Sequence, residues 1–95
     1  MNTISLKKIR EFVELHPDSK SSLTAWYKMA KKARWRSLAA VREVYPHADL
    51  VGKYTIFNIR GNHYRLIAEI NYQYQQILIR EILTHEEYDN DKWKS

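Results

Sequence analysis

The sequence contains no cysteine, and this absence excludes several kinds of chemistry. Disulfide bonds, thiolate nucleophiles and zinc–thiolate sites are all ruled out, and the chain is compatible with a reducing environment. The histidines are too scattered to form a familiar metal-binding pair such as His-x-x-x-His; they are His16, His47, His63 and His85. The sequence therefore predicts a protein that uses no metal and no other cofactor.

Long apolar stretches are also lacking. No apolar run approaches the ~20 residues that span a bilayer, and the N-terminus does not have the apolar segment of a signal peptide. We therefore expect a cytoplasmic protein with no membrane contact. The 95 residues are enough for one hydrophobic core and too few for two, which predicts a single domain over residues 1–95.

Acidic residues are outnumbered by basic ones. The chain has 16 Lys and Arg against 11 Asp and Glu, which gives a net charge of +5 and an isoelectric point near 9.5. This excess suggests an anionic partner such as a nucleic acid, but many small proteins are basic for solubility alone. The positions of the basic residues have to decide between these interpretations.

Apolar residues in the first half of the chain follow the 3.6-residue period of helices. After a short strand at residues 2–4, Ser5 is placed to cap a helix that Pro17 ends. A second helix starts near Asp18 or Ser19. Its buried stripe is expected to contain Leu23, Trp26, Tyr27 and Ala30.

The end of the second helix is strongly basic, and an aromatic residue lies within the cluster: Lys28, Lys31, Lys32, Arg34, Trp35 and Arg36. Basic residues with an interleaved aromatic can bind an RNA backbone and stack a base. Lys and Arg are also favoured in the last turn of a helix because they oppose its dipole. Both interpretations stand for the basic residues, whereas Trp35 fits the core better.

A third, short helix is predicted between Ser37, its N-cap, and Pro46, which stops it. Its inward-facing residues are expected to be Leu38, Val41, Val44 and Tyr45. A turn around Gly52 follows, and there the apolar period changes from 3.6 to 2 residues. This change marks the start of a sheet.

Three strands of an antiparallel meander are predicted, at residues 54–60, 63–70 and 75–83. Gly61 and Asn62 form a two-residue hairpin signal between the first two, which sets Asn58 opposite Arg65. A tight loop at residues 71–74 would then place Arg80 opposite Arg65.

Two opposed arginines need an explanation, because like charges across a sheet cost on the order of 0.2 to 1 kcal/mol. A phosphate bound between Arg65 and Arg80 would remove the repulsion, since guanidinium groups bind phosphate in bidentate fashion. Alternatively, an acid such as Glu69 or Glu81 neutralises one of them, although Glu81 is expected on the opposite face.

The segment after the third strand predicts a short helical turn, because Thr84 and Glu87 form a capping box. His85 and Tyr88 then lie on one side of that turn. Residues 90–95 are expected to form a frayed tail, in which Trp93 docks on the core or is held by a partner.

Arginine, histidine and tyrosine without a metal suit RNA cleavage in which the ribose 2′-OH attacks the neighbouring phosphate. The RNA supplies its own nucleophile, so the protein has only to orient the chain, move protons and stabilise charge. We predict Arg65 and Arg80 as phosphate ligands, His85 as a general acid or base, and Tyr88 as its partner or a stacking surface.

Three segments of the chain form a recognisable pattern: Phe57-Asn58-Ile59-Arg60-Gly61-Asn62-His63-Tyr64-Arg65-Leu66, residues 72–76 with Ile79-Arg80, and Thr84-His85-Glu86-Glu87-Tyr88-Asp89. In these segments the chain resembles the HigB family of bacterial toxins. Shorter similar segments are Ile9-Arg10-Glu11-Phe12, His16-Pro17-Asp18, Ala25-Trp26-Tyr27 and Tyr45-Pro46-His47-Ala48-Asp49.

The resemblance implies a RelE-like α+β fold, with N-terminal helices packed on a small twisted antiparallel sheet. It implies an mRNA interferase, acting mostly at the ribosome, that is neutralised in a hetero-oligomer by a HigA-type helix-turn-helix antitoxin through which DNA is bound. Family members place sheet arginines and C-terminal residues in the cleavage site, which correspond here to Arg65, Arg80, His85 and Tyr88. Further candidates for RNA contact are Lys53, Arg60, Asn62 and His63.

The basic residues Lys31, Lys32, Arg34 and Arg36 would bind ribosomal RNA or the antitoxin, and the sequence does not separate these uses. Two alternative functions remain at this point. One is a non-catalytic module that binds RNA or the ribosome, and the other is a toxin of the same fold that inhibits DNA gyrase.

Overall fold

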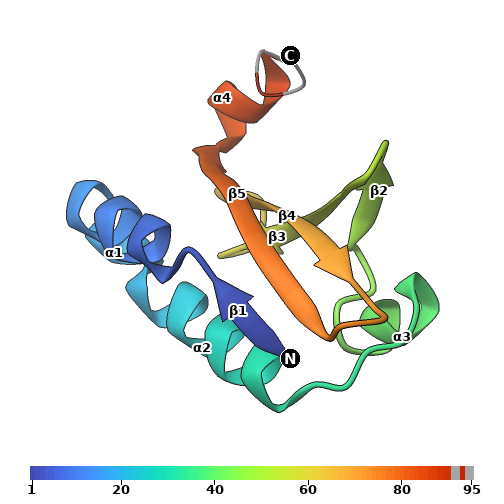
Figure 1. Cartoon of the computed structure of the whole chain (residues 1–95). Helices are drawn as coiled ribbons and strands as arrows, with labels where there is room; N and C mark the ends of the chain where they lie inside the picture. Colours follow the sequence, from blue (N-terminus) through green and yellow to red (C-terminus); the bar gives the residue numbers. More distant parts are fainter. Residues whose placement is uncertain (91–92, 94–95) are drawn as a thin grey trace.

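A five-stranded sheet with helices packed against it makes up the protein, as a computed structural model that describes residues 1–90 and 93 shows (Figure 1). The strands are β1 (Asn2–Ile4), β2 (Asp49–Val51), β3 (Tyr54–Ile59), β4 (Tyr64–Asn71) and β5 (Gln76–Thr84), and their order in the sheet is β1-β5-β4-β3-β2. The helices are α1 (Leu6–Leu15), the 3-10 helix η1 (Pro17–Ser19), α2 (Lys20–Lys32), α3 (Leu38–Val44) and α4 (His85–Asp89).

The predicted α+β fold is confirmed, with one difference in the sheet. β2, β3, β4 and β5 are antiparallel neighbours, but β1 pairs in parallel with β5. The sheet is therefore mixed rather than wholly antiparallel. No helix within residues 1–90 is long and apolar enough to cross a membrane.

Helices α1 and α2 lie together on one side of the sheet, and the hydrophobic core fills the space between them and the strands (Figure 1). The Trp26 ring of α2 meets the Phe57 ring of β3 edge to face, with ring centroids 5.4 Å apart. Trp35 is also buried, as expected, and its ring stacks on that of Phe57. Tyr27, expected in the buried stripe, is only partly buried.

Two details of the helical half differ from the sequence prediction. α2 ends at Lys32, so Arg34, Trp35 and Arg36 lie in the connection that follows it rather than in the helix. Val44 was expected to face inward, but its side chain is exposed. Within α3 only Val41 is fully buried.

The predicted caps have different outcomes. Ser37 accepts a hydrogen bond from the Ala40 amide (3.3 Å), and Thr84 begins α4 with a complete capping box. Ser5 precedes α1 as expected but makes no capping bond with its side chain and has a φ of 74°. Its left-handed backbone turns the chain from β1 into α1.

The register of the β3–β4 hairpin is confirmed, with Asn58 opposite Arg65 and Phe57 opposite Leu66. The strands stop at Ile59 and Tyr64, which leaves residues 60–63 as the hairpin loop. Arg60 and Gly61 both have positive φ, and the His63 amide closes the loop by donating to the Arg60 carbonyl (3.2 Å).

The predicted antiparallel pairing of β4 with β5 is confirmed, but its predicted register is wrong. Arg65 lies opposite Leu83, not opposite Arg80. β4 continues to Asn71, one residue further than predicted, and a β-bulge then inserts Arg80 as an extra residue between the pairs Ile67–Glu81 and Ala68–Ile79. The longer strand and the bulge together move Arg80 away from Arg65 along the sheet.

The second face of the sheet is covered in part by the C-terminal segment. The cross-strand pair Ile56 and Ile67 is buried on this face. Trp93 stacks on Tyr88 (ring centroids 5.1 Å apart) and meets the edge of Tyr54, so it docks on its own chain. Residues 91–92 and 94–95 of the predicted tail lie outside the described residues.

Candidate functional site

Arg65, on β4, contacts both the hairpin loop and helix α4. Its guanidinium donates to the Tyr64 carbonyl (3.1 Å) and to Oδ1 of Asn62 (3.3 Å), and it lies 5.6 Å from the centre of the Tyr88 ring. The side chain is only 9% exposed. These contacts fix the planar group in one orientation while using two of its five N–H donors.

Helix α4 is joined to the hairpin loop, which brings the C-terminal candidates to Arg65. The His85 amide donates to the carbonyl of His63 (3.0 Å), and the capping box of Thr84 fixes the direction of the first turn. The His85 ring lies 3.1 Å from the Asp89 carboxylate, which orients the imidazole. The structure thus gathers five predicted site residues: Asn62, His63, Arg65, His85 and Tyr88.

Arg80 and Lys53 form a separate cationic pair on the same face of the sheet. Oε1 of Glu69 lies 3.7 Å from Nε of Arg80 and 3.4 Å from Nζ of Lys53. The sequence left open that an acid such as Glu69 neutralises one of the two arginines, and the structure shows this ion pair between Glu69 and Arg80. Glu81 also departs from expectation, because its pairing with Ile67 places it on the Arg65 face.

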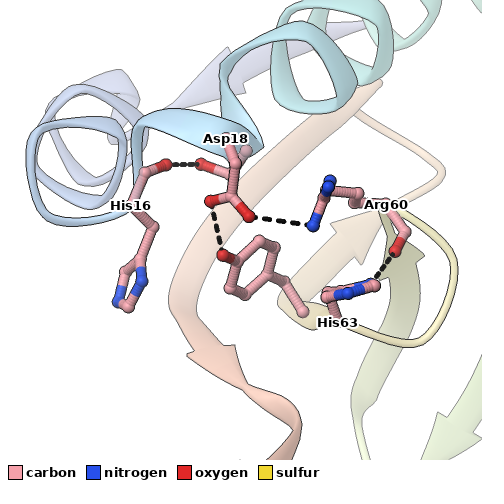
Figure 2. Close-up of polar contacts among 6 residues, drawn as sticks. His16, Asp18, Arg60 and His63 are labelled. Carbon is pink, nitrogen blue, oxygen red and sulfur yellow. Dashed lines mark hydrogen bonds and ion pairs between the residues drawn. The ribbon is translucent and has the colours of Figure 1, made fainter.

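Arg60 is engaged by a residue that the sequence did not single out. Figure 2 shows the Asp18 carboxylate between the helices and the hairpin loop. Its Oδ2 accepts from Arg60 (2.9 Å) and its Oδ1 from the Tyr64 hydroxyl (2.6 Å). The Tyr64 hydrogen bond and, after it, the Arg60 charge lower the pKa of Asp18 from its usual value, and the same hydrogen bond raises the pKa of Tyr64.

These contacts give Asp18 a clear structural role. It joins η1, directly before α2, to the loop that carries Asn62 and His63. His63 in turn bonds the Arg60 carbonyl through Nδ1 (2.9 Å) (Figure 2). Asp18 is 42 residues before Arg60, so no local pattern predicts the pair. The only signal was that the segment around it resembles a known family.

The basic residues near the end of α2 lie elsewhere. Lys31 and Lys32 are exposed in its last turn. Arg34 and Arg36 border an open hollow of about 600 Å³ beside Tyr72 and the loop that follows β4. That loop is at the opposite end of β4 from Arg65, so these cations form a second basic surface.

A metal site can be assessed for the part of the chain that the structure describes. No group of three His, Asp or Glu side chains there is arranged to hold a metal ion. That the reaction needs no metal stays a prediction.

Comparison with known proteins agrees with the fold. A family model described as the HigB toxin, the RelE-like toxic component of a toxin–antitoxin system, matches residues 19–91. The chain is 30% identical over 92 residues to the mRNA interferase toxin HigB of Escherichia coli strain K12, an alignment that covers 94% of this chain and 88% of that protein. The mRNA interferase HigB of Shigella flexneri matches to the same extent, and one from Escherichia coli O6:H1 is 26% identical over 92 residues, covering 94% of this chain and 89% of that protein.

The helices and the five-stranded mixed sheet are consistent with a RelE-like toxin fold. The chain belongs to the HigB family of these toxins, which confirms the family predicted from the sequence. Membership in a toxin–antitoxin system implies an antitoxin as partner.

Proposed function

We propose that this protein is an mRNA interferase, an endoribonuclease that cuts messages and so inhibits translation. The names of its relatives support the activity. The observation that carries it to particular residues is the buried Arg65 guanidinium, held beside Asn62 and Tyr88 with donors remaining for a phosphate.

The reaction assigned to this site is attack of a ribose 2′-OH on the adjacent phosphate. The 2′-oxygen forms a bond to phosphorus, the 5′-oxygen of the next nucleotide leaves, and a proton passes from the first oxygen to the second through the protein. Arg65 stabilises the charge that develops on the phosphate oxygens. His85 serves as general acid or base, and Tyr88 as its partner in proton transfer or as a stacking surface.

The sequence suggested that Arg80 binds the same phosphate as Arg65, but in this proposal it has a different role. It shares Glu69 with Lys53, away from Arg65, and this position suits contact with a neighbouring phosphate of the message rather than the one being cut. His63 can contact RNA at the loop, whereas Arg60 supports the loop through Asp18.

We further propose that the protein acts on translating ribosomes in the cytoplasm and is silenced by a HigA-type helix-turn-helix antitoxin. Toxin and antitoxin would form a hetero-oligomer that binds DNA through the antitoxin. The second basic surface, formed by Lys31, Lys32, Arg34 and Arg36, would contact ribosomal RNA or that antitoxin.

Expression in bacteria, with and without the antitoxin, tests the proposal. We expect growth arrest together with new RNA 5′ ends inside codons, and rescue by the antitoxin. Arrest with intact transcripts and DNA damage would instead indicate a gyrase inhibitor, and an absence of arrest would indicate a non-catalytic RNA-binding module.

A further inference from the structure

An open hollow lies between the segment that follows α3 and the hairpin loop, and it is lined by Asn62, the hydrogen-bond partner of Arg65. Its volume is about 400 Å³, within the range of roughly 300–1,000 Å³ for sites that bind small ligands. One wall is formed by Tyr45, Pro46 and His47, and the other by Asn58, Gly61 and Asn62.

The first wall consists of side chains that contain rings, and packing and hydrogen bonds hold it in place. The Tyr45 ring packs edge to face against both Phe57 and Trp35, with ring centroids 5.4 Å and 6.2 Å away. The backbone after it is closed by a hydrogen bond from the Ala48 amide to the Tyr45 carbonyl (3.0 Å), and Arg42 binds the Ala48 carbonyl (2.9 Å). A flat ring that enters the hollow would thus meet a preformed surface, with the exposed His47 at its rim.

The second wall carries side-chain amides. Asn62 uses its Oδ1 to accept from Arg65, which leaves its amide nitrogen as a donor. Asn58 lies directly across from Arg65 on the same face, and no hydrogen bond of its side chain is described among residues 1–90 and 93. An asparagine amide offers a donor and an acceptor side by side, the arrangement that pairs with the edge of a nucleobase.

We propose that this hollow is a subsite for an unstacked nucleobase of the RNA strand whose phosphate is bound at Arg65. Rings on one wall stack the base, and the amides of Asn58 and Asn62 bind its edge, which is how proteins read single-stranded RNA. The subsite rests on the proposed function, because Arg65 positions the strand, and it makes the choice of cleavage site depend on the base that enters the hollow.

Binding can be tested without cleavage. The probes are 2′-deoxy dinucleotides of each base, which lack the attacking hydroxyl, and the readout is the imidazole C–H NMR signals of the protein. The signals of His47 should shift saturably with at least one probe, while those of His16, which stacks on Phe12 away from the hollow, should stay in place. Unmoved His47 signals with shifted His85 signals would overturn the subsite.

The Asn58→Ala variant tests the amide wall, with Asn2→Ala as its control because Asn2 is an exposed asparagine on β1 of the same sheet. We expect Asn58→Ala to lower the affinity for the dinucleotide that binds best by about tenfold, the effect of losing one contact to a base edge. Cleavage should continue, with a broader distribution of bases beside the cut sites. An unchanged affinity and distribution would contradict the inference.

The two proposals fail in different ways. If wild-type protein binds dinucleotides at His47 but cuts no message, the proposed function is wrong, and the hollow binds a nucleobase without cleavage. If it cuts messages while Asn58→Ala retains both affinity and cut-site preference, the function stands and the subsite is wrong.

Discussion

Arg65 is the one charged side chain that is buried within residues 1–90 and 93. Burying a guanidinium costs free energy unless its N–H donors are hydrogen-bonded. The Tyr64 carbonyl and Asn62 accept from only two of the five donors of Arg65. Preorganised donors of this kind stabilise a developing negative charge without rearrangement. This is why the proposed chemistry depends on Arg65 before any other residue.

Replacing Arg65 should therefore affect cleavage more than stability. We expect Arg65→Ala to slow message cleavage by roughly 10²- to 10³-fold, and Arg65→Lys to restore little of it because a point charge does not reproduce the fork. Arg80→Ala is the matched control, since Arg80 is half-exposed and bonded to Glu69. It should weaken binding mainly at low salt. Equal losses from Arg65→Ala and Arg80→Ala, measured as cleavage rates of folded variants, would refute this ranking.

The hairpin loop and the helical layer act as one unit because Asp18 joins them. Its carboxylate accepts hydrogen bonds from Arg60, the first residue of the loop that carries Asn62 and His63 (Figure 2), and from Tyr64, the residue directly after that loop. Since the pKa of Asp18 is lowered in the folded state, folding is favoured above its unfolded pKa, near 3.8, and this contribution disappears as the pH falls through the lower folded pKa.

The Asp18→Asn variant should show this dependence directly. At neutral pH it should unfold at a lower urea concentration than the wild type, and the difference should shrink as the pH falls below about 3.8. Tyr64→Phe, which removes the hydrogen bond that lowers the pKa most, should reduce the acid dependence in part. A difference in urea midpoint that does not vary with pH would show that Asp18 is not ionised against these partners.

Helix α4 positions Tyr88 over Arg65 although it is only five residues long. Such a short helix depends on its cap, and the Thr84 hydroxyl accepts from the Glu87 amide (3.1 Å). Loss of an N-cap costs about 1 kcal/mol. Thr84→Ala should lower the free energy of unfolding by about this amount, which leaves most molecules folded.

Cleavage by Thr84→Ala should fall further than its small unfolded fraction explains, because Tyr88 and His85 lose their fixed direction. Thr84→Ser, which keeps the capping hydroxyl, should retain activity. Denaturant unfolding and cleavage rates measured on the same samples decide this. Full activity in Thr84→Ala would show that α4 is held by other contacts.

The elements differ in how well their sequence predicts them. The β3–β4 register followed from a period-2 pattern and a short loop, both of which are local. The β4–β5 register did not, because the extra residue of β4 and the bulge at Arg80 leave the apolar alternation readable in more than one way. The Asp18 contacts were beyond prediction since they join residues more than 40 positions apart.

On the scale of the whole molecule, the net charge of +5 is distributed over distinct sites. Arg65 faces the proposed phosphate, Lys53 and Arg80 share Glu69 along the same face, and Arg34 and Arg36 border the hollow near the other end of β4. The basic composition predicted an anionic partner, but only the fold separates a site for chemistry from surfaces for binding.

The chemistry can be identified from the ends of the RNA fragments. Attack by the 2′-OH leaves a 2′,3′-cyclic phosphate on the upstream fragment, whereas hydrolysis assisted by a metal-bound water typically leaves a free 3′-hydroxyl. The most direct test is to add the wild-type protein and Arg65→Ala to a reconstituted translation reaction with a defined message and to analyse both ends at each cut. We predict cuts inside codons with 2′,3′-cyclic phosphate ends for the wild type, and an almost intact message for Arg65→Ala. Fragments with free 3′-hydroxyl ends, or undiminished cutting by folded Arg65→Ala, would contradict the account.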